Sequence, residues 1–340
     1  MSARMIPTDA IPPRLREDVA VAAPPRVTVV IPTFNWSTVL PFSIGTALGQ
    51  TVRDIEVLVV GDGCTDGSEA TVRAIDDPRV QWINLPRNSG HQSAPNNEGL
   101  RQARGDLIAY LGHDDLWLPH HLALGVEALA GEAALSYGIT AAVRPNGTVQ
   151  FMPPRFDYRP GACPPPSSIV HRRAMTEAIG GWRPAAELRE APDPDLWRRA
   201  HAAGYRFAFV PRLSAIKFPA QWRRDAYRIR ACDEQADWFR RIREEPNLEA
   251  IVLGRLVESA GGASALRLLR YSDLLREVVS EAVERVRIRL SDQSPAVFFG
   301  AGKGARLDAY RRFKGLPPAD TRVHDEADAP KESGKEKDPC

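Results

Sequence analysis

The sequence lacks long apolar runs: no segment approaches the roughly 20 apolar residues that a membrane-spanning helix needs. The first 25 residues carry early charges and several prolines, without the apolar core of a signal peptide. We therefore expect a soluble, cytoplasmic protein without a transmembrane segment. Peripheral contact with the inner face of the membrane stays compatible with this pattern.

Cysteine is scarce, and its spacing is irregular. The chain has four cysteines, Cys64, Cys163, Cys232 and Cys340, with no paired spacing. Disulfide frameworks and structural zinc sites need closely spaced or evenly paired cysteines. The pattern therefore indicates free thiols in a reducing compartment.

An excess of one charge is also missing, since the formal net charge is only +2. Nucleic-acid-binding domains usually carry a strong basic footprint, so we expect no nucleic-acid partner. After the first apolar run the chain has Pro32-Thr33-Phe34-Asn35 instead of a glycine-rich phosphate loop. This excludes a Rossmann dehydrogenase and argues against a nucleotidyltransferase.

The first part of the chain alternates apolar runs with helical spacing. Such runs, which are rich in β-branched residues, are typical of strands buried on both faces of a parallel sheet. The expected strands are residues 27–31, 55–60, 80–85 and 107–111, and the expected helices are 37–50, 68–75 and 96–103. The pattern predicts an α/β fold with a doubly wound, mostly parallel sheet flanked by helices.

The rest of the chain is predicted to complete this domain and then to become helical. We expect helices at 120–130 and 194–203, a strand pair at 135–139 and 148–151, strands at 167–170 and 205–210, and further helices at 221–244, 248–260 and 271–291. The predicted division is a flexible leader (1–25), a domain in two halves (26–118 and 119–220), a C-terminal helical appendage (221–316) and a disordered tail (317–340). The appendage either packs on the domain or serves self-association as a homo-oligomer.

Polar clusters follow each of the early strands. In doubly wound sheets the ligand lies beyond the carboxyl ends of the strands, where these clusters meet. Asp114 and Asp115 directly follow a buried strand, and buried carboxylates are costly unless a cation or hydrogen-bond donors meet them. A hard divalent cation that bridges a diphosphate would fit, and a helix N-cap is the alternative.

The ordered motifs resemble those of family 2 glycosyltransferases with the GT-A fold. They run from Val29 to Asn35 and from Val59 to Ser68, through Asn88, Gly90, Asn96–Gly99, Ala103–Asp106 and Asp114-Asp115, to Gly180-Gly181-Trp182, Asp193–Arg199 and Gly204-Tyr205. Each motif is weak alone, whereas their order and spacing over about 26–215 are specific. The helical part after Gln221 lies outside the resemblance.

The resemblance implies an enzyme that transfers a sugar from a nucleotide diphosphate donor to an acceptor hydroxyl, with inversion at the anomeric carbon. It implies that Asp115 binds Mn²⁺ or Mg²⁺ and that Asp114 accepts a ribose hydrogen bond or supports the metal shell. The family often has a carboxylate where this chain has Gly112, which weakens the expected metal site. His113 is either a ligand or a hydrogen-bonding neighbour.

The same resemblance predicts the nucleotide-binding residues. Asp62 matches the position that reads the nucleobase, which favours a UDP-sugar, and a turn-capping role is the alternative. The other expected nucleotide-binding residues are Pro32, Thr33, Asn35, Asn88, Gly90 and Asn96; Asn35 is equally compatible with a turn former. A basic residue common in the family is replaced by Pro95, which leaves the diphosphate contact to Arg87 or to a residue from the later loops.

The catalytic base is predicted to be Asp193, which takes the proton of the acceptor hydroxyl. Glu190 and Asp195 are the alternatives, and the Glu that usually precedes the base is missing. Trp182 is expected either in the acceptor site or in the core. The acceptor cannot be read from the residues, and the family favours polysaccharide or lipid-linked glycan synthesis. A catalytically silent nucleotide-sugar-binding or assembly protein is the alternative function.

Overall fold

The computed structural model describes residues 24–152, 158–160, 163–188 and 190–259. Strands and helices alternate through the first half, as the sequence predicts. The elements are β1 (Val27–Thr33), α1 (Leu40–Leu48), β2 (Ile55–Gly61), α2 (Ser68–Arg73), β3 (Val80–Asn84), α3 (Ser93–Gln102), β4 (Leu107–Tyr110), β5 (Leu116–Trp117), α4 (His121–Ala128), β6 (Leu135–Val143), β7 (Val149–Met152), β8 (Ile169–Arg172), α5 (Arg173–Ala178), α6 (Pro192–Ala202), β9 (Phe207–Lys217), α7 (Ala226–Ile229), α8 (Asp233–Glu244) and α9 (Leu248–Ser259). Short 3₁₀ turns occupy Pro166–Ser168, Ala185–Glu187 and Ala220–Trp222.

The described strands form one sheet in the order β3-β2-β1-β4-β8-β6-β9-β5, with β7 paired to β6. The strands β1 to β4 are parallel, which confirms the prediction for the first half. Strand β8 runs antiparallel to both β4 and β6, whereas β6 and β9 are parallel again. The fold is therefore the predicted α/β class, with a mixed second half.

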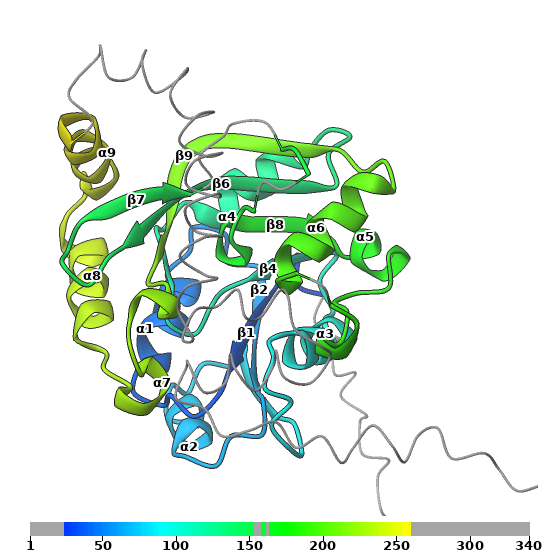
Figure 1. Cartoon of the computed structure of the whole chain (residues 1–340), viewed down its shortest axis with the longest axis horizontal. Helices are drawn as coiled ribbons and strands as arrows, with labels where there is room; N and C mark the ends of the chain where they lie inside the picture. The colour runs from blue at the N-terminus through cyan, green and yellow to red at the C-terminus, as the bar shows by residue number, and fades with distance from the viewer. Residues whose placement is uncertain (1–23, 153–157, 161–162, 189, 260–340) are drawn as a thin grey trace, which may run out of the picture.

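Helices cover both faces of the sheet (Figure 1). Successive residues of β1 point to opposite faces, and both faces are apolar: Val29 joins the cluster under α1 and α4, and Val30 joins the cluster under α3 and α6. This explains why β1 reads as a continuous apolar run. Two cores of this kind hold the rims of the parallel strands, and with them the polar loops, in fixed positions.

Several predicted elements have different bounds in the structure, and two of the differences have a clear physical reason. Strand β9 continues past Val210 to Lys217, because a register shift against β6 accommodates the residues between Val210 and Leu213. The helix predicted over residues 221–244 is divided, since Asp225 and Arg230 adopt positive φ values of 53° and 54° on either side of α7. Left-handed backbone at a residue with a side chain interrupts a helix.

The helices after residue 221 pack on the domain. Trp238 of α8 and Leu248 of α9 are 8% and 2% exposed and belong to a cluster with Leu116 and Ile216. This face of the predicted appendage is therefore part of the domain core. The predicted leader up to residue 23, the predicted helix at 271–291 and the predicted tail lie outside the described residues.

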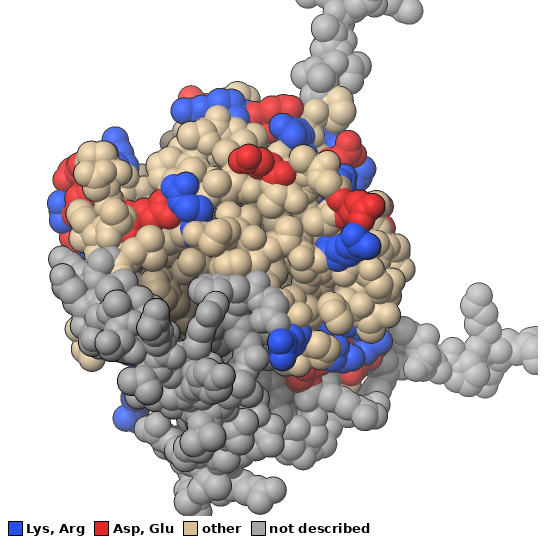
Figure 2. All heavy atoms as spheres, turned by 90° about the horizontal axis from the view of Figure 1, so that it is seen from above, with Lys and Arg blue, Asp and Glu red and all other residues tan. Residues whose placement is uncertain are grey.

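The surface shows no dominant sign of charge on the face that Figure 2 presents. Basic and acidic side chains alternate there in small groups. None of the helices in the described ranges has both the length and the apolar character required to cross a bilayer.

Helix α3 lies so close to β1 that only glycine fits at the contact. A Cβ atom on Gly99 would overlap Cγ1 of Val30. We expect Gly99→Ala to lower the free energy of unfolding by about 1–3 kcal/mol, because overpacking separates the helix from the strand. Denaturant unfolding would measure this change.

Gly131→Ala is the matched control, since no atom lies within 4 Å of the added methyl group. This variant should unfold at the same denaturant concentration as the original protein. Equal stability of the two alanine variants would contradict the close α3–β1 contact.

Candidate functional site

The loops after β1, β2 and β3 meet at the carboxyl ends of the parallel strands. The backbone N–H of Asp62 donates to Thr33 O at 2.8 Å. The Asp62 carboxylate accepts hydrogen bonds from the N–H groups of Ser89 (2.9 Å) and Gly90 (3.0 Å), and Asn88 Nδ2 donates to Asp62 O. The structure thus brings the predicted residues Thr33, Asp62, Asn88 and Gly90 together, with Asp62 as the anchor of the third loop.

Asn35 has the geometry of a turn former. Its φ of 47° is left-handed, and its Oδ1 accepts hydrogen bonds from the N–H groups of Thr65 (2.7 Å) and Asp66 (3.2 Å). The neighbouring Pro32 is half-buried in β1. These contacts fix the loop after β1 against the loop after β2.

Several buried polar atoms in this region have no hydrogen-bond partner among the described residues. They are Thr33 Oγ1, Asn88 Oδ1 and both side-chain polar atoms of Asn96, whose residue is 1% exposed. Buried polar groups are nearly always hydrogen-bonded in folded proteins. All three residues were predicted from the sequence to bind the nucleotide.

Asp115 is fully buried and held by three donors. Its Oδ2 accepts from Ser167 Oγ (2.5 Å) and Lys217 Nζ (2.8 Å), and its Oδ1 accepts from the Phe218 N–H (3.1 Å). Burial opposes the charge of Lys217, but the carboxylates of Asp115 and Asp114 outweigh it and raise the pKa of the ammonium. Lys217 therefore stays protonated at neutral pH.

The residues around Asp115 do not fit a bound divalent cation in this arrangement. The ammonium and the hydroxyl contact Asp115 Oδ2 and the Phe218 N–H contacts Oδ1, so both carboxylate oxygens already have donors where a metal ion would bind. A Cβ atom at Gly112 would lie 2.8 Å from Asp115 Oδ2, so the carboxylate that the family often has there would require the Asp115 side chain to move. Within the described ranges, no three His, Cys, Asp or Glu residues are grouped as a metal site would require.

Asp193 lies in the first turn of α6 and is half-buried. Cys163 Sγ donates a hydrogen bond of 3.2 Å to its Oδ2. Burial raises the pKa of Asp193, while the Cys163 hydrogen bond and the charge of Lys217 oppose the rise. Lys217 therefore acts electrostatically on both Asp115 and Asp193, which links the two carboxylates across the site.

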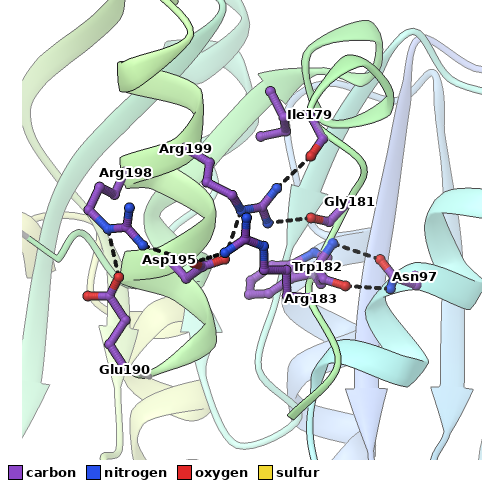
Figure 3. Close-up of polar contacts among 9 residues, drawn as sticks. All are labelled: Asn97, Ile179, Gly181, Trp182, Arg183, Glu190, Asp195, Arg198 and Arg199. Atoms are coloured by element: carbon purple, nitrogen blue, oxygen red, sulfur yellow. Dashed lines mark hydrogen bonds and ion pairs between the residues drawn. The ribbon is translucent and has the colours of Figure 1, made fainter. Parts of the chain in front are cut away.

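The other predicted candidates for the base are held in ion pairs (Figure 3). Asp195 is 3% exposed and contacts Arg183 (3.4 Å), Arg198 (3.0 Å) and Arg199 (2.8 Å). Glu190 contacts Arg198 at 2.8 Å. Asp195 thus anchors a cluster of arginines. Of the three carboxylates in this segment, Asp193 is the one whose charge acts on Lys217.

Arg199 extends this cluster to the turn before Trp182. Its guanidinium donates to the backbone oxygens of Ile179 and Gly181, each at 2.6 Å. Asn97 then holds Trp182, because its side chain bonds both the N–H (2.9 Å) and the carbonyl (2.8 Å) of that residue. Figure 3 shows these contacts running from α6 to α3.

Trp182 lies in the core and not in an open acceptor site. It is 1% exposed, and its Nε1 donates to Tyr110 Oη at 2.9 Å. Its ring stands edge-on to Tyr110 and Trp197. Of the two sequence interpretations, core burial agrees with this placement, because no face of the indole is available to a sugar.

Sequence reasoning missed Lys217, Ser167 and Cys163 as site residues. Lys217 had one signal in the sequence, because it is the only lysine in the first 302 residues. Ser167 and Cys163 had none, because their contacts with Asp115 and Asp193 depend on the tertiary fold.

Comparison with known proteins confirms the resemblance. Residues 28–179 match the model of the family described as Glycosyl transferase family 2. Succinoglycan biosynthesis protein ExoO of Rhizobium meliloti is 40% identical over 108 residues, which are 32% of this chain and 31% of the relative. The GalNAc(5)-diNAcBac-PP-undecaprenol beta-1,3-glucosyltransferase of Campylobacter jejuni is 31% identical over 96 residues, 27% of this chain and 30% of the relative.

The fold also matches a solved structure. The crystal structure of S. aureus TarS 1-349 in complex with UDP superposes with a TM-score of 0.50 and 16% identity, covering 85% of this chain and 90% of that one. This likeness shows the GT-A-like fold. The chain spans about a third of the length of the first curated relatives that it matches.

The arginine cluster around Asp195 should be structural. We expect Asp195→Asn to lower the free energy of unfolding by about 1.5–3 kcal/mol, because charge-assisted hydrogen bonds to three guanidinium groups are lost. Thermal and denaturant unfolding would measure the loss.

Glu190→Gln is the matched control in the same segment. Glu190 is 37% exposed and has one arginine partner, so its loss should cost less than about 1 kcal/mol. If Asp195→Asn were as stable as Glu190→Gln, the anchoring role of Asp195 would be refuted.

Proposed function

Residues 28–179 form a segment of glycosyl transferase family 2, and from this premise we propose that the chain transfers a sugar from a nucleotide diphosphate donor to an acceptor hydroxyl. The observation that supports this most is the electrostatic link from Asp115 through Lys217 to Asp193. It joins the expected diphosphate side and the expected acceptor side of one site.

The proposed reaction is an inverting displacement. The Asp193 carboxylate accepts the proton of the acceptor hydroxyl, whose oxygen forms the new bond to the anomeric carbon. The bond from that carbon to the diphosphate oxygen breaks, and its electron pair leaves with the nucleoside diphosphate. The raised pKa of Asp193 suits this task, because a carboxylate of higher pKa is a stronger proton acceptor.

The proposed donor pocket lies at the loops after β1 to β3. Thr33, Asn88 and Asn96 have polar atoms that a nucleotide would satisfy. Asp62 lies at this pocket and matches the family position that reads the nucleobase, and a carboxylate is a group that accepts the imide N–H of uracil. We therefore propose a UDP-sugar.

Family membership favours a divalent cation, and the sequence predicts Mn²⁺ or Mg²⁺ at Asp115. Such an ion would neutralise the charge of the leaving diphosphate. The oxygens of Asp115 are already engaged by Ser167, Lys217 and Phe218, so we assign no step to a metal.

The acceptor is proposed to belong to a polysaccharide or a lipid-linked glycan. The matched relatives are named for succinoglycan biosynthesis and for transfer to an undecaprenol-linked glycan, which supports this class. A site at the cytoplasmic side of the membrane would be consistent with such acceptors, and peripheral contact remains part of the proposal.

Asp193→Asn tests the proposed base. The change should lower the rate of transfer about 10²–10⁴-fold, the usual contribution of a general base, because the amide cannot accept the proton. Affinity for the nucleotide should stay within about threefold, since the donor contacts are elsewhere. Nucleotide release in the presence of acceptor and calorimetric binding of the nucleotide would measure the two quantities.

Glu190→Gln again serves as the control, because this residue begins the same segment and pairs with Arg198. It should retain most of the activity. Nucleotide binding without any turnover in the original protein, over a range of glycan acceptors, would favour the silent binding protein instead.

The pH dependence should report Asp193 as well. Transfer needs the ionised carboxylate, so activity is present above its pKa and is lost as the pH falls through it. Because burial raises this pKa, the acid limb of the rate profile should lie above 3.8, the ordinary value. The Cys163 hydrogen bond lowers the pKa, so Cys163→Ala should move the limb to higher pH.

The control for this profile is Cys232→Ala, because Cys232 packs against the cluster of Trp36, Val39, Ala220 and Ala226, outside these contacts. Its acid limb should match that of the original protein. A limb that moves to lower pH in Cys163→Ala would show that the thiol does not stabilise the Asp193 carboxylate.

A further inference from the structure

We propose that Lys217 is the cationic residue that binds the donor diphosphate, and that Asp115 fixes its position instead of binding a metal. This inference rests on the proposed function and names the group that neutralises the leaving diphosphate. The sequence left that contact open between Arg87 and a residue from the later loops.

The sheet places the two residues opposite each other. Leu116 of β5 pairs with Ile216 of β9 in an antiparallel register. The residue before Leu116 therefore faces the residue after Ile216, and these are Asp115 and Lys217. The ion pair is thus built into the strand pairing and does not depend on a mobile loop.

The hydrogen bonds divide the roles between the two residues. Asp115 accepts from three donors, Ser167 Oγ, Lys217 Nζ and the Phe218 N–H, so most of its capacity is used. An ammonium has three N–H donors, and within the described ranges Lys217 makes one hydrogen bond, to Asp115. Two donors are left for the oxygens of a ligand.

The position of Lys217 is partly open. Its side chain is 23% exposed, whereas that of Asp115 is 0% exposed. The carboxylate of Asp193, the proposed base, is close enough to act on the charge of Lys217. A diphosphate bound by Lys217 would therefore lie in the same site as the proposed base.

The nearby arginines are less suited to this contact. Arg223 is held by Glu234 through two hydrogen bonds of 2.7 Å, and the arginines of α6 surround Asp195. Arg87 is exposed on the loop after β3. A lysine ammonium is a compact charge with three donors, and held in a fixed position it can stabilise the charge that develops on the leaving diphosphate.

The test is calorimetric binding of UDP to the full chain, with EDTA in one series and Mn²⁺ in the other. We expect the affinity of the original protein to agree within about threefold between the two series. Lys217→Gln should weaken UDP at least about tenfold, because charge-assisted phosphate contacts are lost, and Lys217→Arg should recover most of the affinity. Uridine, which has no diphosphate, should bind equally to all of them.

Two matched variants sharpen the result. Arg87→Gln should bind UDP as the original protein does. Asp115→Asn should weaken UDP by the same factor in the EDTA and the Mn²⁺ series, because the ammonium loses the carboxylate that positions it, whereas a metal ligand at this position would lose only the Mn²⁺-dependent binding. If Lys217→Gln fails to fold, Asp115→Asn/Lys217→Gln, which removes both buried charges, is compared with Asp115→Asn alone.

The outcomes separate this inference from the proposed function. UDP binding that requires Mn²⁺ and disappears in Asp115→Asn would overturn the role of Lys217 and leave the transferase proposal standing. Unchanged affinity in Lys217→Gln would do the same. If UDP, GDP, CDP and dTDP all fail to bind the original protein in both series, the proposed function falls, and the inference falls with it.

Discussion

The ion pair between Asp115 and Lys217 joins the two halves of this molecule. Asp115 follows the last of the parallel strands, and Lys217 ends β9, which belongs to the mixed half of the sheet. A carboxylate with 0% exposure is costly unless a cation and hydrogen bonds meet it. Because β9 supplies the cation, the proposed donor side of the site is complete only when the second half of the sheet is in place.

Much of the first half could be predicted from local sequence alone. The strands β1, β2 and β4 are buried on both faces, and such strands read as uninterrupted apolar runs. Parallel strands end at one rim, so the polar residues that follow them, such as Thr33 and Asp62, were expected to converge. The proposed role of Asp193 came from the family motif, and the structure places this carboxylate half-buried beside Cys163.

The remaining features depend on contacts between distant segments, which a single sequence does not encode in its local pattern. Lys217 lies beyond Pro211 and Arg212, where the apolar run in the sequence ends. The strand continues past these residues because its pairing register with β6 shifts there. Asp195 follows Asp193 by two residues and has the same chemistry, yet the arginines of α6 bind one and not the other. For Trp182 the motif favoured the acceptor site with the core as the alternative, and the surrounding aromatic rings decide for the core.

The sheet also shows that the matched family segment is not a folding unit by itself. That segment ends at residue 179, whereas β6 pairs along most of its length with β9, and β5 pairs only with β9. A fragment cut at the family boundary would expose the edges of both strands and the apolar surface that Trp238 covers. Such a fragment would aggregate, so the shortest workable expression boundary lies after α9.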